Sequence, residues 1–303
     1  VLFAPARNVP GFLVKGNKYR GDMKAIPSSW GNGITLINVL PMEDYLKGVV
    51  PSEIVPSWRM DAIKAQAVAA RTYATYHRNG YRSSGYDVTD DTRTQVYRGF
   101  SAETAATNRA VSETAGEVVT YAGKPIDALF HSSGGGFTEN SENVWGSVIP
   151  YLRGVKEESS TYLMTPWKKT MTMASFTKSL ENAGYKIGDL KSIKLSHLKK
   201  GEANHSSDRG ISGRVKSVVF VGKKGRATVS GERLQRLYGL DSTLFDISAK
   251  GKELTITGYG YGHGLGLSQW GAEAMAEKHG DGKNYYKTIL SHYFTGTKIE
   301  KIY

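Results

Sequence analysis

The sequence predicts an α+β protein of mixed helices and antiparallel strands that form a core, with an inserted smaller α/β module. Three observations favour this class. Strand patterns occur near both ends of the chain, and helical patterns lie between and after them. The two kinds of pattern do not alternate in the regular order of parallel α/β folds. At 303 residues, the chain is long enough for about two domains.

The first part of the chain is predicted to begin with strands and to continue with helices. Apolar residues and turn residues indicate a β-rich N-terminus with a strand at 33–40, and a short helix is expected at 41–48. The longest helical pattern covers about 58–77, with Ser57 available as its N-cap. A second Ala-rich pattern predicts a helix at 101–114.

The elements expected farther along the chain are shorter. Strands at 117–121 and 126–131 are predicted, joined by a turn at 122–125. The same kinds of pattern predict helices at 174–183 and 231–237 and strands at 215–221 and 254–267. Ser268 is expected to cap a last helix that extends toward Lys278.

The composition excludes several classes of protein. A hydrophobic content of 39% and a charged content of 22% exclude a wholly disordered chain. No apolar run approaches the roughly 18 residues of a membrane-spanning helix, so no transmembrane segment is predicted. The absence of cysteine excludes disulfides, a thiol nucleophile and thiolate metal ligands. The chain begins at Val1 without a charged leader, which is typical of a mature fragment whose signal segment has been removed.

The chain is basic, and the excess is concentrated in one stretch. A formal net charge of +12 indicates an anionic neighbour such as nucleic acid, an acidic polymer or a bacterial wall. Between Lys186 and Arg236 there are 13 basic and four acidic residues, which account for +9 of that charge. We interpret the stretch as part of an inserted module with a basic surface. The alternative is an ordinary solvated face of Lys and Arg side chains.

Glu53 is the first candidate for catalytic chemistry. It is expected to lie in a loop that Pro51 and Pro56 make stiff, because each proline fixes its own φ and restricts the preceding residue. Apolar neighbours, including Trp58, would raise the pKa of this carboxyl, which is the state that a general acid needs near neutral pH. The alternative is an exposed Glu without a catalytic role.

Two cations on the following helix are the next candidates. Lys64 and Arg71 are seven residues apart, so they share a helix face and lie about 10 Å apart along the axis. The alanines between them are small enough to let another backbone approach closely. The alternative is that Lys64 and Arg71 form a solvated face and that the alanines are only good helix formers.

Other catalytic and binding motifs are absent or incomplete. The glycines at 258–266 alternate, so the dinucleotide-binding fingerprint fails, and we expect a strand with one bare face for close approach. There is no Walker A, HExxH or G-x-S-x-G motif. His131 precedes a Ser/Gly-rich loop that is suited either to hydroxyl-rich ligands or to a structural role. The histidines are scattered, so no metal site is predicted.

Several motifs resemble the stage II sporulation protein D family, which includes the amidase enhancers. They extend from about residue 40 to 297 in the order of the family, and together they are highly specific. The matching segments are Pro51-Ser52-Glu53, DAIKAQAVAART at 61–72, DTRTQVY at 91–97, HSSGG at 131–135, NSENVW at 140–145, SGRV at 212–215 and GYGHGLGLSQWGA at 260–272. Two further segments, 40–46 and 292–297, resemble the amidase-enhancer branch more than the sporulation branch.

The resemblance implies a lytic transglycosylase that acts on peptidoglycan glycan strands, with one Glu as both acid and base. That Glu matches Glu53, and Lys64 and Arg71 match residues that line the family's groove. Further groove residues implied by the resemblance are Gln95, Tyr97, His131, Ser132 and His263. Some members of the family bind zinc through Cys and His. This chain has Thr94 where such a Cys stands, so we expect no zinc site and no cofactor.

The resemblance also implies a domain organisation, a location and partners. We expect a core at 1–163 and 255–303 and an inserted basic module at 164–254, outside the cytoplasm, in the wall or at the outer face of a Gram-positive-type membrane. Glycan strands are the expected partner. The alternative function is a non-catalytic enhancer that binds the wall and stimulates an N-acetylmuramoyl-L-alanine amidase. A nucleic-acid partner is not expected, because no nucleic-acid-binding signature is present.

Overall fold

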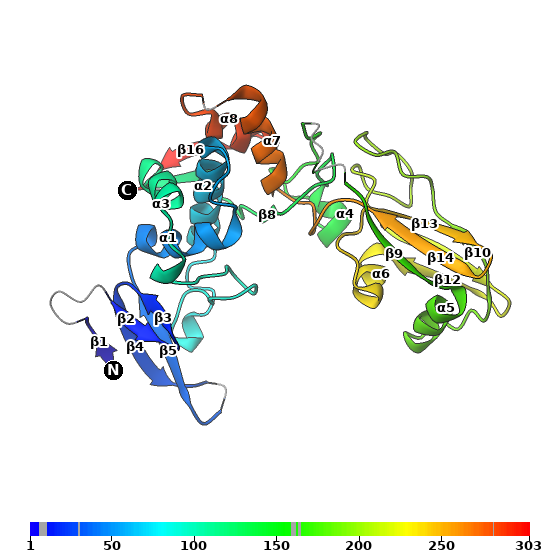
Figure 1. The fold of residues 1–303 in the computed structure, drawn as a ribbon, viewed down its shortest axis with the longest axis horizontal. Helices are drawn as coiled ribbons and strands as arrows, with labels where there is room; N and C mark the ends of the chain where they lie inside the picture. The colour runs from blue at the N-terminus through cyan, green and yellow to red at the C-terminus, as the bar shows by residue number, and fades with distance from the viewer. Residues whose placement is uncertain (6–10, 30, 159–161, 163–164, 281) are drawn as a thin grey trace. The chain divides into compact units, whose positions relative to one another are not determined.

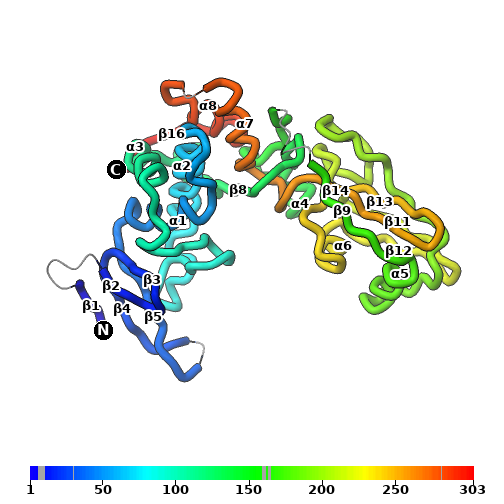
Figure 2. Tube along the Cα trace, viewed as in Figure 1, coloured from blue at the N-terminus to red at the C-terminus, as the bar shows by residue number. Residues whose placement is uncertain are grey.

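The computed structural model describes residues 1–5, 11–29, 31–158, 162, 165–280 and 282–303 and confirms the α+β class. Its sheets are small, with two or three strands each, and all strand pairs but one are antiparallel within these residues. The chain forms two compact units. The first contains Val1–Leu129, Ala276–Ser291 and Thr297–Tyr303, and the second contains Phe130–Met275 and His292–Gly296 (Figures 1 and 2).

The domain division expected from the sequence stays a prediction. Its boundary between residues 163 and 164 lies outside the described residues. Among those that are described, no helix combines the length and the apolar character that crossing a bilayer requires.

The first unit begins with short antiparallel strands, as predicted. β1 (Leu2–Phe3), β4 (Asp22–Pro27) and β5 (Ile34–Val39) form one sheet in the order β1-β4-β5, and β5 confirms the strand expected at 33–40. β2 (Phe12–Val14) and β3 (Asn17–Tyr19) form a separate hairpin.

Three helices that follow these strands in the chain pack together. They are α1 (Met42–Glu53), α2 (Met60–Tyr76) and α3 (Ala105–Glu113), accompanied by the 3-10 turns η1 (Arg82–Ser84) and η2 (Phe100–Ala102) (Figure 1). Their shared core includes Leu46, Val49, Ile63, Ala67 and Val111, all with no exposed surface. The five alanines between Ala62 and Ala70 are also fully buried, so α2 is enclosed by close neighbours.

The helix boundaries correct three details of the prediction. α1 extends five residues beyond the expected end at Gly48, through Pro51 to Glu53, because a proline in the last turn loses only one helical hydrogen bond. α2 begins after Arg59, so Ser57 is not its N-cap. The helix expected at 101–114 begins only at Ala105, where the Thr104 side chain accepts a hydrogen bond from the Thr107 backbone N–H.

A three-stranded sheet joins the middle of the chain to its end. β16 (Lys298–Lys301), β6 (Glu117–Tyr121) and β7 (Lys124–Pro125) lie in that order. The turn is only Ala122 and Gly123, both with positive φ, so the predicted four-residue turn is wrong. Residues 126–129 are not part of a strand, so only β8 (Phe130–His131) remains of the strand expected at 126–131.

The second unit contains two three-stranded antiparallel sheets and two helices that cover them. The sheets are β13 (Phe245–Lys250), β14 (Glu253–Gly258) and β9 (Trp167–Thr172), and β10 (Leu190–Lys194), β11 (Ser217–Gly222) and β12 (Arg226–Ser230). The helices α5 (Met173–Asn182) and α6 (Gly231–Tyr238) confirm both helical predictions. Phe176 and Leu234 pack from these helices into one core with Phe220 and Ile256 of the two sheets.

The alternating glycines do not form a strand. β14 ends at Gly258, and Gly260, Gly262, Gly264 and Gly266 all have φ between 66° and 94°, which a strand does not permit. The expectation of a strand at 254–267 is therefore wrong beyond residue 258. Other groups do approach these glycines closely, but they are backbone and side-chain atoms of the protein itself. A Cβ on Gly260, for example, would lie 2.7 Å from the Ser133 carbonyl oxygen.

The remaining elements surround this glycine segment or follow it. β15 (Leu267–Ser268) pairs in parallel with β8. Ser268 caps α7 (Gln269–His279) as predicted, since its hydroxyl accepts a hydrogen bond from the Gly271 N–H at 3.2 Å. α4 (Ser141–Trp145) and α8 (Tyr285–Tyr293) were not predicted from the sequence.

Candidate active site

Glu53 lies at the C-terminal end of α1, and the expectation that it lies in a loop is wrong. The helix ends after it because Ile54 is extended, with φ −129° and ψ 154°, and packs into the core. Pro56 reinforces this ending by restricting Val55 to extended conformations. The buried Ile54 and the proline-restricted Val55, both directly after Glu53, therefore fix the backbone that carries the Glu53 carboxylate.

The pKa of Glu53 is raised above the ordinary value for glutamate, as the apolar neighbours predicted. Burial is the dominant cause, because a half-buried carboxylate loses part of its hydration. A hydrogen bond from the Val96 N–H to Glu53 Oε1, at 3.2 Å, acts in the opposite direction. The C-terminal end of α1 carries the negative end of the helix dipole, which also disfavours the ionised form of Glu53.

The segment that contacts Glu53 is fixed by the two residues beside Val96. Gln95 is buried, accepts a hydrogen bond from Tyr45 Oη at 3.1 Å and donates one to the Ala70 carbonyl at 3.2 Å. Tyr97 is also buried, and its hydroxyl donates to Asn38 Oδ1 at 2.7 Å. Gln95 and Tyr97 therefore determine where the Val96 N–H points.

A glycine in α1 makes this arrangement possible. A Cβ on Gly48 would lie 2.5 Å from a ring carbon of Tyr97, so the ring packs directly on the helix backbone. Tyr45 of the same helix packs against this ring in a tilted arrangement, with centroids 5.2 Å apart. The sequence alone does not reveal this contact, because nothing in the pattern at 41–48 distinguishes Gly48 from a helix-ending glycine.

A cleft of about 1150 Å³ opens beside these tyrosines within the first unit. Tyr45 and Tyr97 line it together with β5 and the segment around η1. Its charged lining is mainly cationic, with Lys15, Lys24, Arg78, Arg82, Arg93 and Arg98 against Asp87 and Asp90. A cleft of this size and charge can hold an extended polymer with anionic substituents.

Arg71 is buried, so the alternative that it belongs to a solvated face is wrong. Its guanidinium donates two hydrogen bonds to Glu43, at 2.9 and 2.7 Å, and others to the carbonyls of Val111 and Glu117. Burial, the largest single effect, would raise the pKa of Glu43, but the hydrogen bonds from Arg71, Tyr303 and the Gly116 N–H, together with the charge of Arg71, outweigh it and the pKa is lowered. Arg71 thus links α1, α2, α3 and β6.

Lys64 has a different environment on the same helix. Its side chain is 16% exposed and forms an ion pair with Glu113 of α3 at 2.6 Å. Its ammonium group also lies 5.7 Å from the centre of the Tyr286 ring. The substrate-binding roles expected for Lys64 and Arg71 stay predictions.

The remaining predicted site residues lie in the second unit. His131 is buried, and burial, together with the nearby charges of His263 and Arg214, lowers its pKa well below the ordinary value. Its Nδ1 lies 3.0 Å from the Leu265 carbonyl oxygen. The Leu265 N–H donates to Nδ1 of His263, so Nε2 of His263 carries the proton and donates to the Phe130 carbonyl. Ser132 is partly exposed beside this histidine pair.

The zinc ligands of some family members have no counterpart in this chain. The Thr94 hydroxyl lies 2.9 Å from that of Thr89 and accepts a hydrogen bond from the Thr89 N–H at 3.2 Å. A neutral hydroxyl used in this way is a poor zinc ligand, and the chain has no cysteine. The described residues contain no cluster of three or more His, Asp or Glu that could hold a metal ion. The residues present do not fit the zinc site.

The altered titration of Glu53 predicts how stability depends on pH. Because the pKa of Glu53 is raised in the folded protein, its protonated carboxyl stabilises the fold relative to the unfolded chain. This contribution is fully present below the ordinary pKa of glutamate. It is lost as the pH rises through the raised pKa of the folded protein. Glu53→Gln removes the charge and keeps an acceptor for the Val96 N–H. We expect the variant to be more stable than wild type at about pH 7.5, and the two to be equal at about pH 4.

Urea unfolding at both pH values measures this effect. A variant that is less stable than wild type at the higher pH would show that the ionised carboxylate is favoured in the folded protein.

Two family models match the chain, one within each unit. The model described as stage II sporulation protein matches residues 31–121, and a domain of unknown function matches residues 134–266. Stage II sporulation protein D of Bacillus subtilis (strain 168) is 34% identical over 282 residues, which cover 86% of this chain and 75% of that protein. The chain belongs to the stage II sporulation protein D family.

Two further relatives are similar at the same level. An uncharacterised protein of Brachyspira hyodysenteriae is 34% identical over 291 residues, covering 95% of this chain and 74% of that protein. The amidase enhancer of Bacillus subtilis is 33% identical over 294 residues. That match covers 84% of this chain and 40% of the enhancer.

Proposed function

We propose that the protein is a peptidoglycan lytic transglycosylase whose single general acid and base is Glu53. The observation that carries the proposal is a half-buried glutamate with a raised pKa at the position that matches the family's catalytic Glu. Membership of the family supports a role at the bacterial cell wall. We propose accordingly that the protein acts outside the cytoplasm, with glycan strands as its main partner.

The proposed reaction uses the Glu53 carboxyl twice, first as an acid and then as a base. The protonated carboxyl donates its proton to the oxygen that joins C1 of N-acetylmuramic acid to N-acetylglucosamine, and the C1–O bond breaks. The resulting carboxylate accepts the proton of the muramic C6 hydroxyl as that oxygen bonds to C1. The products are a 1,6-anhydro end and a free N-acetylglucosamine end, Glu53 is protonated again, and no water is consumed.

The surrounding residues are proposed to position the acid and the strand. Gln95 and Tyr97 keep the Val96 N–H on the carboxylate, where it stabilises the ionised form between the two proton transfers. The cationic cleft lined by Tyr45 and Tyr97 is proposed to bind the strand. Arg71 is proposed as a positioning residue that holds α1 in place through Glu43.

The second candidate function is a non-catalytic enhancer of a wall amidase. The similarity to the amidase enhancer over 84% of this chain favours it. In that case Glu53 would be inherited without being used, and an N-acetylmuramoyl-L-alanine amidase would be a protein partner. The two functions make opposite predictions for a Glu53 variant.

Mass spectrometry of digested glycan strands tests the proposal. Purified strands, with and without peptide stems, are incubated with wild type and with Glu53→Gln, and new chain ends are identified. We expect anhydro-muramic ends from wild type alone. Strands that are pulled down by both proteins but cut by neither, together with equal stimulation of an amidase, would favour the enhancer.

A further inference from the structure

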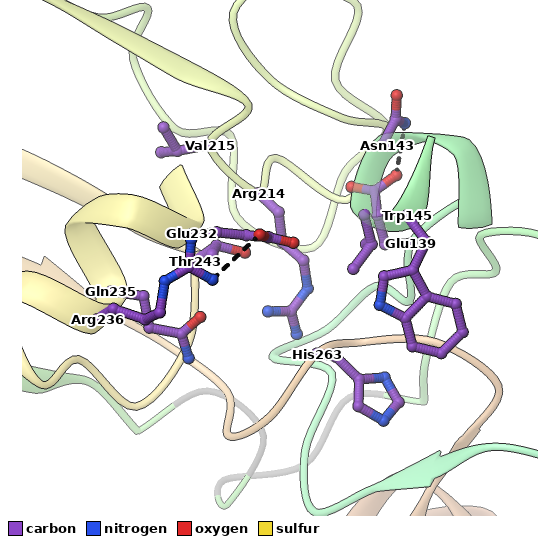
Figure 3. Close-up of a pocket in the computed structure, with 11 residues that line it drawn as sticks. Glu139, Asn143, Trp145, Arg214, Val215, Glu232, Gln235, Arg236, Thr243 and His263 are labelled. Carbon is purple, nitrogen blue, oxygen red and sulfur yellow. Dashed lines mark hydrogen bonds and ion pairs between the residues drawn. The ribbon is translucent and has the colours of Figure 1, made fainter. Parts of the chain in front are cut away.

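A pocket of about 360 Å³ lies within the second unit and is not lined by Glu53, Gln95 or Tyr97, although His263 of the expected groove residues does line it (Figure 3). α4 contributes Asn143 and Trp145 to it, and α6 contributes Gln235 and Arg236. His263, from the glycine segment, lies at the side of the pocket nearest the indole. Its volume is near the lower end of the roughly 300–1,000 Å³ typical of small-molecule sites.

Two aromatic rings form one wall of the pocket. The Trp145 side chain is 48% exposed, which is unusual for so large an apolar group, and its ring lies 5.9 Å from that of His263. Both nitrogens of His263 are already engaged, with the Leu265 N–H and the Phe130 carbonyl. The imidazole and the Trp145 indole together form the aromatic side of the pocket.

The rest of the lining is polar, and its charges are balanced. Arg236 forms an exposed ion pair with Glu232 at 3.4 Å, a contact weak enough to be exchanged for one with a ligand. The buried cation Arg214 is accompanied by the buried Glu139. Two arginines thus face two glutamates, and the amides of Asn143 and Gln235 add both donors and acceptors.

The floor of the pocket is rigid. Glu139 accepts hydrogen bonds from the Ile211 and Ser212 N–H groups, from the Ser212 hydroxyl and from the Asn143 amide, all between 2.6 and 3.1 Å. Arg214 donates to the Gly262 carbonyl at 3.1 Å. A ligand would therefore enter a shape that already exists, which limits the loss of conformational entropy on binding.

We propose that this pocket binds one uncharged sugar ring of a glycan chain, stacked on Trp145. A sugar ring has an apolar face for the indole and hydroxyl groups that both donate and accept, which fits planar polar side chains of balanced charge. The pocket chemistry is independent of Glu53. Only the choice of a wall glycan as the source of the ring rests on the proposed function.

Binding of N-acetylglucosamine oligomers, followed by calorimetry, tests this assignment. The measurement uses the full chain carrying Glu53→Gln, so that binding is observed without cleavage. We expect Trp145→Ala to weaken the affinity at least ~10-fold, as is usual when a central aromatic anchor is truncated. Tyr76→Ala is the matched control, because Tyr76 is 51% exposed and lies in the first unit, and it should leave the affinity unchanged.

A second variant and a salt series complete the test. Gln235→Ala removes a polar lining group without opening the core, and we expect a ~3–10-fold loss of affinity. Because the site is charge-balanced, affinity should change less than ~2-fold between about 50 and about 300 mM salt. An affinity unaffected by Trp145→Ala in a folded protein, or tighter binding of acidic oligosaccharides that salt abolishes, would overturn the assignment. If the protein does not cleave strands, the proposed reaction is wrong, but the binding results at this pocket are unaffected. The proposals for the reaction and for the pocket can therefore fail independently.

Discussion

Replacing Glu53 by glutamine is expected to lower the rate of anhydro-end formation by about 10²–10⁴-fold, the usual contribution of a general acid or base. The upper part of this range is expected, because one carboxyl serves in both proton transfers. Glutamine has nearly the same shape and keeps an acceptor for the Val96 N–H, so the loss reports chemistry rather than folding. Time courses of product formation on purified strands measure it.

The surface variant Glu181→Gln is the control for this experiment, since Glu181 is an exposed residue of α5 and should retain the wild-type rate. The pH profile gives an independent check. The leaving oxygen needs the protonated form of Glu53, so the wild-type rate should fall as the pH rises through the raised pKa. An equal rate for Glu53→Gln and wild type would remove Glu53 from the mechanism.

Truncation of Arg71 to alanine is expected to lower the free energy of unfolding by about 3–5 kcal/mol, the range found when one partner of a buried ion pair is removed. The guanidinium has no exposed surface and donates to Glu43 and to the carbonyls of Val111 and Glu117. Alanine would leave the Glu43 carboxylate and both carbonyls without these donors. Thermal or urea unfolding measures the loss.

Arg109→Ala is the matched control, because Arg109 forms an exposed ion pair with Glu113 one helical turn away. Such pairs contribute about 0.3–0.5 kcal/mol. The double variant Glu43→Gln, Arg71→Met should recover part of the stability, since it leaves no uncompensated charge. If Arg71→Ala lowers strand binding but leaves stability intact, Arg71 is a substrate ligand and its structural assignment is wrong.

The sequence predicts the α+β class and several elements of this fold because these elements depend on local patterns. β5, β6, α5, α6 and the Ser268 cap each follow from a few consecutive residues. The glycine segment at 260–266 was misinterpreted because alternation in sequence does not distinguish an extended chain from one with positive φ. That difference arises from contacts with Ser133 and Arg214, which are distant in the sequence.

The candidate site shows the same limit. Apolar neighbours predicted the raised pKa of Glu53, but the contact with Val96, 43 residues away, could not be predicted from them. The partner of Arg71 could not be predicted, since Glu43 is 28 residues away and lies on another helix. Trp145 and Arg214 occur in family motifs, yet no pattern indicates that they share a pocket.

The parallel pair of β8 and β15 has a consequence for how the second unit folds. The pair joins Phe130 to Leu267, 137 positions along the chain, so forming it first would close a very long loop for only a few hydrogen bonds. The core around Phe176, Phe220 and Ile256 lies inside that loop and includes the local hairpins β11–β12 and β13–β14. We therefore expect the sheets to assemble first and bring the two strands together, so that closure of the glycine segment is the later step in folding of this unit.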